Sequence, residues 1–176
     1  MTELALAARD GDEDARRDFV LATQADVWRL CRMLGDPDEV DDLTQETYLR
    51  ALGALRRFRG DASARTWLLG IARRVCADGV RRRVRRRRLD QQVRETSRAV
   101  SVGDGADARA LDELIAHLPA DRREAFVLTQ IIGLSYEEAA AVCSCPIGTI
   151  RSRVARARGA LLELLAEGGD EDAATS

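Results

Sequence analysis

Lysine is absent from this 176-residue sequence, and His117 is the only histidine. The sequence also has no nucleophile motif and no glycine-rich loop of the usual phosphate-binding patterns. Histidine is the most common general acid–base group, and nucleophilic catalysis needs a nucleophile positioned beside a base. The sequence therefore predicts no catalytic residues, no cofactor and no enzymatic activity.

The four cysteines are Cys31, Cys76, Cys143 and Cys145, and no two of them form a C-x-x-C pair. His117 is far from each of them in the sequence, whereas a zinc site needs a clear set of four ligands. We therefore expect no metal site. We interpret the cysteines as small buried hydrophobic residues and expect no disulfide framework.

Long apolar runs are also absent, because no stretch approaches the ~20 residues that a transmembrane helix needs. The first residues, MTELALAARDGDED, lack the basic and apolar regions of a signal peptide. We therefore expect a cytoplasmic protein without membrane insertion.

Alanine, leucine, arginine and glutamate are abundant, aromatic residues make up only 4% of the chain, and β-branched runs are missing. This composition favours helices. We predict an all-α protein of two small helical domains joined by a flexible linker. The first domain is expected at 1–89, the linker at 90–108, the second domain at 109–166 and a disordered tail at 167–176.

Charge is distributed very unevenly along the chain. Residues 1–50 hold 6 arginines and 13 acidic residues, a net charge of −7, and residues 51–98 hold 15 arginines and 4 acidic residues, a net charge of +11. Seven of the eight residues at 81–88 are arginines. The two blocks predict one basic partner and one anionic partner. The run at 81–88 itself fits either phosphate or RNA binding or a solvated helix end.

Hydrophobic periodicity predicts a helix at 12–34, a second from about 40 to 58, and a third that starts after a loop at 59–63 and continues into the arginine run. Asp61 or Ser63 is expected to cap this third helix. Two further helices precede Gly133, the first of which ends at Pro119.

A helix-turn-helix is predicted near the end of the chain. Ser135 and Glu138 have the spacing of a capping box, which predicts a helix that begins after Ser135. Residues 144–146 form a short break, and Pro146 suits the first turn of the next helix. The second helix of such a pair enters a DNA major groove.

On this second helix a core-facing stripe is expected, which comprises Ile147, Ile150, Val154, Ala157, Leu161 and Leu165. The opposite side carries small residues around Arg156, with further arginines at its edges. Small residues let the helix axis approach another surface, and arginines suit an anionic one. The alternative interpretation is a solvated basic helix.

The sequence resembles the extracytoplasmic-function (ECF) sigma factors of bacterial RNA polymerase from about residue 18 to residue 165. Three stretches carry the resemblance: EVDDLTQETYLRAL at 39–52, FRGDASARTWLLGIARRVCADGVRRR at 58–83, and LPADRREAFVLTQIIGLSYEEAAAVCSCPIGTIRSRVARAR at 118–158. In that family they bind the polymerase clamp, melt and read the promoter −10 element, and read the −35 element.

The resemblance implies three sets of site residues. The β′ clamp helices would contact Asp42, Gln45, Glu46 and Leu49. The single-stranded −10 element would contact Arg59, Gly60, Asp61, Ala62, Ser63, Arg65, Trp67, Arg73, Arg74 and Arg81. The duplex −35 element would contact Thr149, Arg151, Ser152, Arg153, Ala155, Arg156 and Arg158.

Two positions in the second set are open. Trp67 has the chemistry to stack on an unpaired base, but its spacing with Leu68 and Ile71 also fits core packing. Arg74 departs from the family, which often has asparagine there.

The family further implies core RNA polymerase, through its β′ and β subunits, and an anti-sigma factor as partners. A linker that runs through the polymerase interior is also implied. The alternatives are a free-standing helix-turn-helix regulator and an arginine-rich RNA-binding protein.

Overall fold

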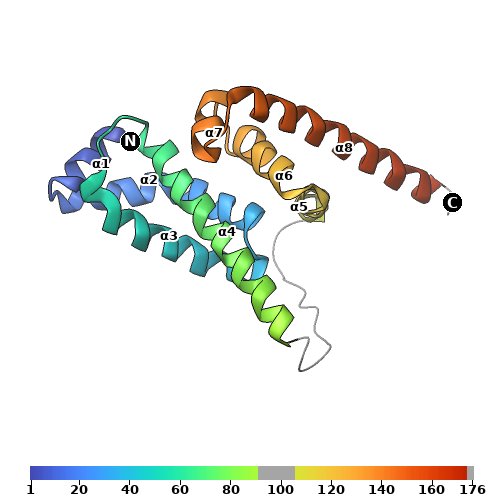
Figure 1. Cartoon of the computed structure of the whole chain (residues 1–176), viewed down its shortest axis with the longest axis horizontal. Helices are drawn as coiled ribbons and strands as arrows, with labels where there is room; N and C mark the ends of the chain where they lie inside the picture. Colours follow the sequence, from blue (N-terminus) through green and yellow to red (C-terminus); the bar gives the residue numbers. More distant parts are fainter. Residues whose placement is uncertain (91–105, 174–176) are drawn as a thin grey trace. The chain divides into compact units, whose positions relative to one another are not determined.

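The structure is a computed structural model that describes the backbone of residues 1–90 and 106–173, and the side chains of 1–86 and 111–166. All regular secondary structure in these residues is helical, as the composition predicts. The chain divides into two compact units, Met1–Val102 and Gly103–Ser176 (Figure 1). The expected linker at 90–108 lies largely outside the described residues. Those of its residues that are described belong to helices.

The described part of the first unit, residues 1–90, contains four α-helices and two short 3₁₀ turns. They are α1 (Thr2–Arg9), α2 (Glu13–Leu34), η1 (Pro37–Glu39), α3 (Val40–Ala54), η2 (Leu55–Arg57) and α4 (Ala64–Asp90). The expected helix at 12–34 is α2, which is capped by the Asp12 side chain through bonds of 2.9 Å from Asp14 N and Ala15 N. Helix α1 is an addition that hydrophobic periodicity did not predict.

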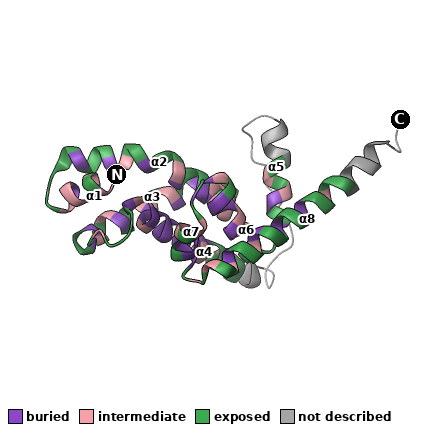
Figure 2. Ribbon diagram, turned by 90° about the horizontal axis from the view of Figure 1, so that it is seen from above, coloured by how far each residue is buried: buried purple, intermediate pink, exposed green. Residues whose placement is uncertain are grey.

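Helices α2, α3 and α4 share the core of the first unit (Figure 2). Its largest fully buried side chains are Phe19, Val27, Leu30, Leu43, Leu68, Leu69 and Val75. Burial of each such side chain contributes about 1.5–3 kcal/mol. Gly79 lets α4 approach α3, because a Cβ atom at Gly79 would lie only 3.0 Å from Leu43 Cδ2.

The second unit consists of α5 (Ala106–His117), α6 (Ala120–Phe126), a π-helical segment η3 (Val127–Ile131), α7 (Tyr136–Cys143) and α8 (Ile147–Ala173). Its core includes Ile115, Leu118, Leu128, Ile150 and Val154. Gly133 ends the segment before α7 with φ +77°, a left-handed conformation that favours glycine.

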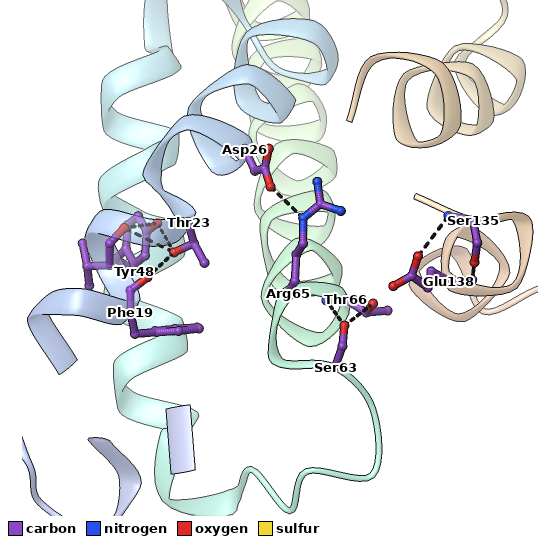
Figure 3. Close-up of polar contacts among 10 residues, drawn as sticks. Phe19, Thr23, Asp26, Tyr48, Ser63, Arg65, Thr66, Ser135 and Glu138 are labelled. Atoms are coloured by element: carbon purple, nitrogen blue, oxygen red, sulfur yellow. Dashed lines mark hydrogen bonds and ion pairs between the residues drawn. The ribbon is translucent and has the colours of Figure 1, made fainter. Parts of the chain in front are cut away.

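The predicted capping box is present at the start of α7. The Ser135 hydroxyl accepts a bond from Glu138 N at 3.1 Å, and the Glu138 carboxylate accepts one from Ser135 N at 2.9 Å (Figure 3). Ser144 follows α7 in a left-handed conformation, with φ 52° and ψ 46°. A cap, a short turn and a second helix confirm the helix-turn-helix that the sequence predicts.

The structure differs from two expectations about the end of the chain. Helix α8 continues to Ala173, through residues where we expected a disordered tail. Residues 160–167, ALLELLAE, are strong helix formers, which explains why the helix does not end at the domain boundary. Leu165 is 56% exposed and is not part of the core stripe, which ends at Leu161.

Candidate functional site

Helix α3 presents an exposed acidic face on the first unit. Val40, Leu43 and Thr47 are buried on its other side. Asp42 and Gln45 are exposed and make no side-chain hydrogen bond or ion pair within the described part of the chain. Leu49, one turn further along, is 63% exposed. The structure therefore brings together free acidic and polar groups and an uncovered leucine, which suits a protein partner with basic and apolar groups.

Glu46, the fourth member of this predicted set, is already paired. Arg50 Nε lies 2.7 Å from Glu46 Oε1, and Arg50 Nη1 lies 3.0 Å from Asp78 Oδ2 on α4. Arg81 Nη2 also lies 2.5 Å from Asp78, and the hydrogen bonds from both arginines lower the pKa of the Asp78 carboxyl. Glu46 thus starts a chain of ion pairs that joins α3 to α4.

The loop at 59–63 connects η2 to α4 and is exposed at its tip. Gly60 has φ +80°, a conformation that residues with a side chain rarely adopt. Arg59 and Asp61 form an exposed ion pair, with Nε and Oδ2 3.0 Å apart. Ala62 and Ser63 are exposed too. The loop offers accessible backbone and small polar groups to a ligand.

Ser63 ends the loop by capping α4. Its hydroxyl accepts a hydrogen bond from Thr66 N at 3.1 Å and lies 2.7 Å from Thr66 Oγ1 (Figure 3). Of the two capping residues that the sequence leaves open, the structure thus selects Ser63. This cap fixes where the loop meets the helix.

Two members of the predicted −10 set pack within the first unit. Arg65 Nε lies 2.7 Å from Asp26 Oδ2 on α2, and the two side chains are only 26% and 20% exposed (Figure 3). Trp67 packs on the buried Phe58, with ring centroids 5.0 Å apart. Trp67 is still half-buried rather than fully enclosed.

The remaining predicted residues of this set lie along α4. Arg74 is exposed and has no partner among the described side chains, whereas Arg73 is half-buried and interacts with a neighbouring group. Arg81 is exposed but tied to Asp78. Beyond them, Arg83 pairs with the buried Asp36. The basic block of α4 therefore combines free arginines with arginines that hold the unit together.

The second helix of the helix-turn-helix has the two sides that its sequence predicts. Ile150, Val154 and Ala157 are buried. The opposite side is exposed and comprises Gly148, Ser152, Ala155, Arg156 and Gly159. Thr149 is half-buried at the start of this helix, and its carbonyl accepts a hydrogen bond from Ser152 Oγ at 3.0 Å.

The four arginines of this helix fall into two classes. Arg153 Nε lies 3.2 Å from Asp121 Oδ2 on α6, and Arg158 donates to Gln130 Oε1 at 2.7 Å. Arg151 and Arg156 are exposed and have no partner among the described side chains. Two arginines are thus available to an anionic ligand, and two are held by neighbouring helices.

Several of these partners were not identified from the sequence: Asp26, Arg50, Asp121 and Gln130. Each lies at least 28 residues from a partner on another element, so no local spacing indicates the pair. The charge of each residue is visible in the sequence, but its partner is not.

None of the four cysteines, all of which are among the described residues, forms a disulfide, and Cys31, Cys76 and Cys143 are buried. A hydrogen bond from Cys76 is the main cause that lowers the pKa of the Cys31 thiol.

The described residues contain no cluster of three or more histidine, cysteine, aspartate or glutamate side chains that can hold a metal ion. None of the described helices has the length and apolarity to cross a bilayer.

Two family models match the chain. The model for sigma-70 region 2 matches residues 19–86, and the model for sigma-70 region 4 matches residues 108–161. Each match lies within one of the two structural units. The first 18 residues, residues 87–107 and residues 162–176 are outside both matches. Helix α1 is outside both.

Curated relatives match nearly the whole chain. It is 51% identical over 168 residues to the ECF RNA polymerase sigma factor SigC of Mycobacterium tuberculosis, covering 92% of this chain and 89% of the relative. It is 38% identical over 168 residues to the ECF RNA polymerase sigma factor EcfG of Rhodopseudomonas palustris, covering 90% of each.

Solved structures have the same fold. The sigma factor RpoE from Bartonella quintana, in complex with the anti-sigma factor NepR, matches with a TM-score of 0.76 and 32% identity, over 88% of this chain and 98% of that one. CnrH, in complex with the cytosolic domain of CnrY, matches with a TM-score of 0.76 and 29% identity, over 94% and 97%. The chain therefore belongs to the ECF sigma factors of bacterial RNA polymerase.

Proposed function

We propose that this ECF sigma factor binds core RNA polymerase through α3, reads the −10 element with the loop at 59–63 and α4, and reads the −35 element with α8. The observation that carries the proposal is that three separate surfaces each have charged side chains without a partner among the described residues. Asp42 is free on α3, Arg74 on α4, and Arg151 and Arg156 on α8. Each surface thus keeps charge that the fold itself does not use.

The polymerase contact is proposed for Asp42, Gln45 and Leu49, with Glu46 at its edge. Exposed apolar groups next to unpaired charges are typical of protein interfaces, and complementary charge steers association. Because Arg50 already neutralises Glu46, Asp42 supplies most of the attraction. The partner surface would be basic, as expected for the β′ clamp helices, and the second unit would contact the β subunit.

The −10 contact is proposed for the loop at 59–63, with Arg74 further along α4. An extruded base needs a pocket of small groups and accessible backbone, and its phosphates need positive charge. Arg59, Gly60, Asp61, Ala62 and Ser63 provide these groups. Arg65, Trp67, Arg73 and Arg81 are assigned mainly to support of the loop and of α4, because each is already packed or paired.

The −35 contact is proposed for the exposed side of α8. Gly148, Ser152 and Ala155 let the helix axis approach the major groove, and Arg156 lies among them. An arginine at such a position donates two parallel hydrogen bonds to guanine. Arg151 at the edge suits a phosphate contact. Arg153 and Arg158 would orient α8 against Asp121 and Gln130.

An anti-sigma factor is proposed as a further partner, because the solved Bartonella relative is held by one. We place the protein in the cytoplasm with its polymerase, and we assign it no catalytic activity of its own. Catalysis would remain with the core enzyme. The domain limits that we propose, 1–89 and 109–166, are supported by the family matches at 19–86 and 108–161.

Transcription with purified core polymerase tests the proposal. Templates randomised over the promoter region are transcribed with and without the chain, and the productive templates are sequenced. A sigma factor yields two enriched elements at fixed spacing and binds core polymerase saturably. A free-standing regulator binds duplex DNA but does not bind core polymerase, and an RNA-binding protein enriches neither element.

A further inference from the structure

Helix α1 lies against the two ends of the loop at 59–63. It packs on α2, η2 and α4 and buries Ala5 and Ala8 in doing so. Neither family model includes it, since the region 2 match begins at residue 19. Its contacts with the loop come from three side chains, Thr2, Leu6 and Arg9, which lie on successive turns.

Thr2 contacts the backbone at the end of the loop. Its hydroxyl accepts a hydrogen bond from Ala64 N at 3.2 Å. Ala64 is the first residue of α4, so its N–H has no acceptor within the helix. Ala64 is also fully buried, and an unpaired N–H there would be costly. The Thr2 hydroxyl therefore fixes the position where the chain leaves the loop.

Arg9 contacts the backbone at the start of the loop. Its Nη1 donates to the carbonyl of Phe58 at 3.3 Å. The guanidinium is oriented for this by Asp10, which accepts from Nε at 2.8 Å and from Nη2 at 3.1 Å. Those bonds raise the pKa of Arg9 and lower that of Asp10. Arg9 is thereby positioned at the residue where the chain enters the loop.

Leu6 lies next to Gly60, near the start of the loop. A Cβ atom at Gly60 would lie 3.7 Å and 3.8 Å from the two Cδ atoms of Leu6, which is ordinary contact distance. The loop has little else to hold its shape, because the Arg59–Asp61 pair is 83% and 73% exposed. Such surface pairs contribute little. The Ser63 cap holds only the side of the loop next to α4.

We infer that α1 is a brace that presets the shape of the loop at 59–63, and that Thr2, Leu6 and Arg9 are positioning residues for −10 recognition. The inference rests on the proposed function of this loop. A preset loop loses less conformational entropy when a base enters it, so base selection depends on the brace. The three residues act through the backbone of the loop and need not touch DNA.

The test uses the full chain with core polymerase. Wild-type holoenzyme first selects −10 and −35 elements from templates randomised over the promoter. Run-off transcription then compares the selected −10 element with single-base mismatches, using Thr2→Val, Arg9→Met and the double variant. We expect the discrimination between matched and mismatched −10 elements to fall about three- to tenfold, the scale of one lost hydrogen bond. Discrimination at −35 and affinity for core polymerase should not change.

Three variants separate positioning from general stabilisation. Thr2→Ser keeps the hydroxyl and should restore wild-type discrimination. Arg17→Met removes an exposed arginine whose ion pair, with Asp14, lies within α2, and should have no effect. Hydrogen exchange on the full chain should show faster exchange of the amides at 60–64 in Thr2→Val, with α2 and α3 unchanged. Faster exchange throughout the first unit in Thr2→Val would mean that α1 only stabilises the fold, and this result would overturn the inference.

The outcomes also separate this inference from the proposed function. If wild-type holoenzyme selects no −10 element, the proposed role of the loop is wrong and the inference falls with it. If wild-type selects one and the double variant discriminates equally well, the loop keeps its role and only the brace is refuted. Reduced −10 discrimination in Thr2→Val together with wild-type discrimination in Thr2→Ser supports the inference that α1 is a brace.

Discussion

Arg153 on α8 is held by Asp121 on α6, with Nε and Oδ2 3.2 Å apart, and its side chain is only 25% exposed. Arg156, one turn further along α8, is exposed and unpaired among the described side chains. Two arginines three residues apart on one helix therefore differ in whether the fold already uses their charge. Sequence alone assigns both to DNA, and the structure makes their roles separable.

Asp121→Asn should strengthen binding to DNA of any sequence. The substitution removes an acidic group and releases Arg153 to reach a phosphate. We expect the salt dependence of binding to steepen by about one unit of slope, because one more counterion is displaced. Fluorescence anisotropy with a scrambled duplex at several salt concentrations measures this slope. An unchanged slope would show that Arg153 does not reach the phosphates of the DNA.

Arg156→Ala should weaken binding to the selected −35 element by about 1–3 kcal/mol, the value of a bidentate contact with guanine. Binding to scrambled duplex should change much less. Arg151→Ala is the matched control, because Arg151 is also exposed and unpaired but lies at the edge of the surface. It should weaken binding to both duplexes alike. Equal behaviour of the two variants would contradict the assignment of Arg156 to base recognition.

The sequence predicted the main helices well, because their signals are local. Apolar spacing marks α2, α3 and α4, and the Ser135–Glu138 box marks the start of α7. Helix α1 was missed since it has only eight residues, and no side chain caps its first turn. It is stabilised by packing on α2, η2 and α4, and periodicity does not report such contacts.

The sequence predicted which residues form the candidate surfaces, but it did not predict which of them are paired with other side chains. The exposed side of α8 and the acidic face of α3 follow from helical spacing alone. The partners of Arg65, Arg153 and Arg158 lie 28 to 39 residues away, so their internal roles require the folded chain. The roles in DNA and polymerase binding remain predictions.

Asp42→Arg should weaken binding to core polymerase by about tenfold or more. The reason is that Asp42 is exposed and unpaired, so a reversed charge acts directly on a basic partner. Glu46→Gln should weaken binding less, because Arg50 already neutralises Glu46. Asp18→Arg, an exposed site on α2, is the control for net charge. A titration of labelled core polymerase measures the three affinities, and equal losses in all three would indicate a nonspecific charge effect.

Stability should fall at alkaline pH through Tyr48. Its hydroxyl lies 2.8 Å from Thr23 Oγ1 (Figure 3), and burial is the main cause that raises its pKa above the ordinary value of 10.0. The unfolded chain therefore ionises Tyr48 first, so stability is present below about pH 10 and is lost as pH rises through the folded pKa. Tyr48→Phe should flatten this loss in thermal unfolding of the first unit. An unchanged slope in the variant would exclude Tyr48 as its source.

Arg65 has two candidate roles, a contact with a DNA phosphate and a structural ion pair with Asp26. Substitution of Asp26 distinguishes the two. The ion pair joins the start of α4 to α2 at 2.7 Å, with both side chains largely shielded from water. If the pair is a tether, Asp26→Asn and Arg65→Met should each lower the free energy of unfolding by about 1–3 kcal/mol. Both should also weaken binding of single-stranded −10 DNA through displacement of the loop.

If Arg65 instead binds a phosphate, the two variants should diverge. Asp26→Asn would free the guanidinium and strengthen binding of the single strand, while Arg65→Met would weaken it. We expect the first pattern, because the pair is well shielded and its geometry is direct. The double variant completes the cycle, and a coupling energy of about 1 kcal/mol between the two positions identifies a tether. Additive effects on stability, with opposite effects on DNA binding, would assign Arg65 to the DNA.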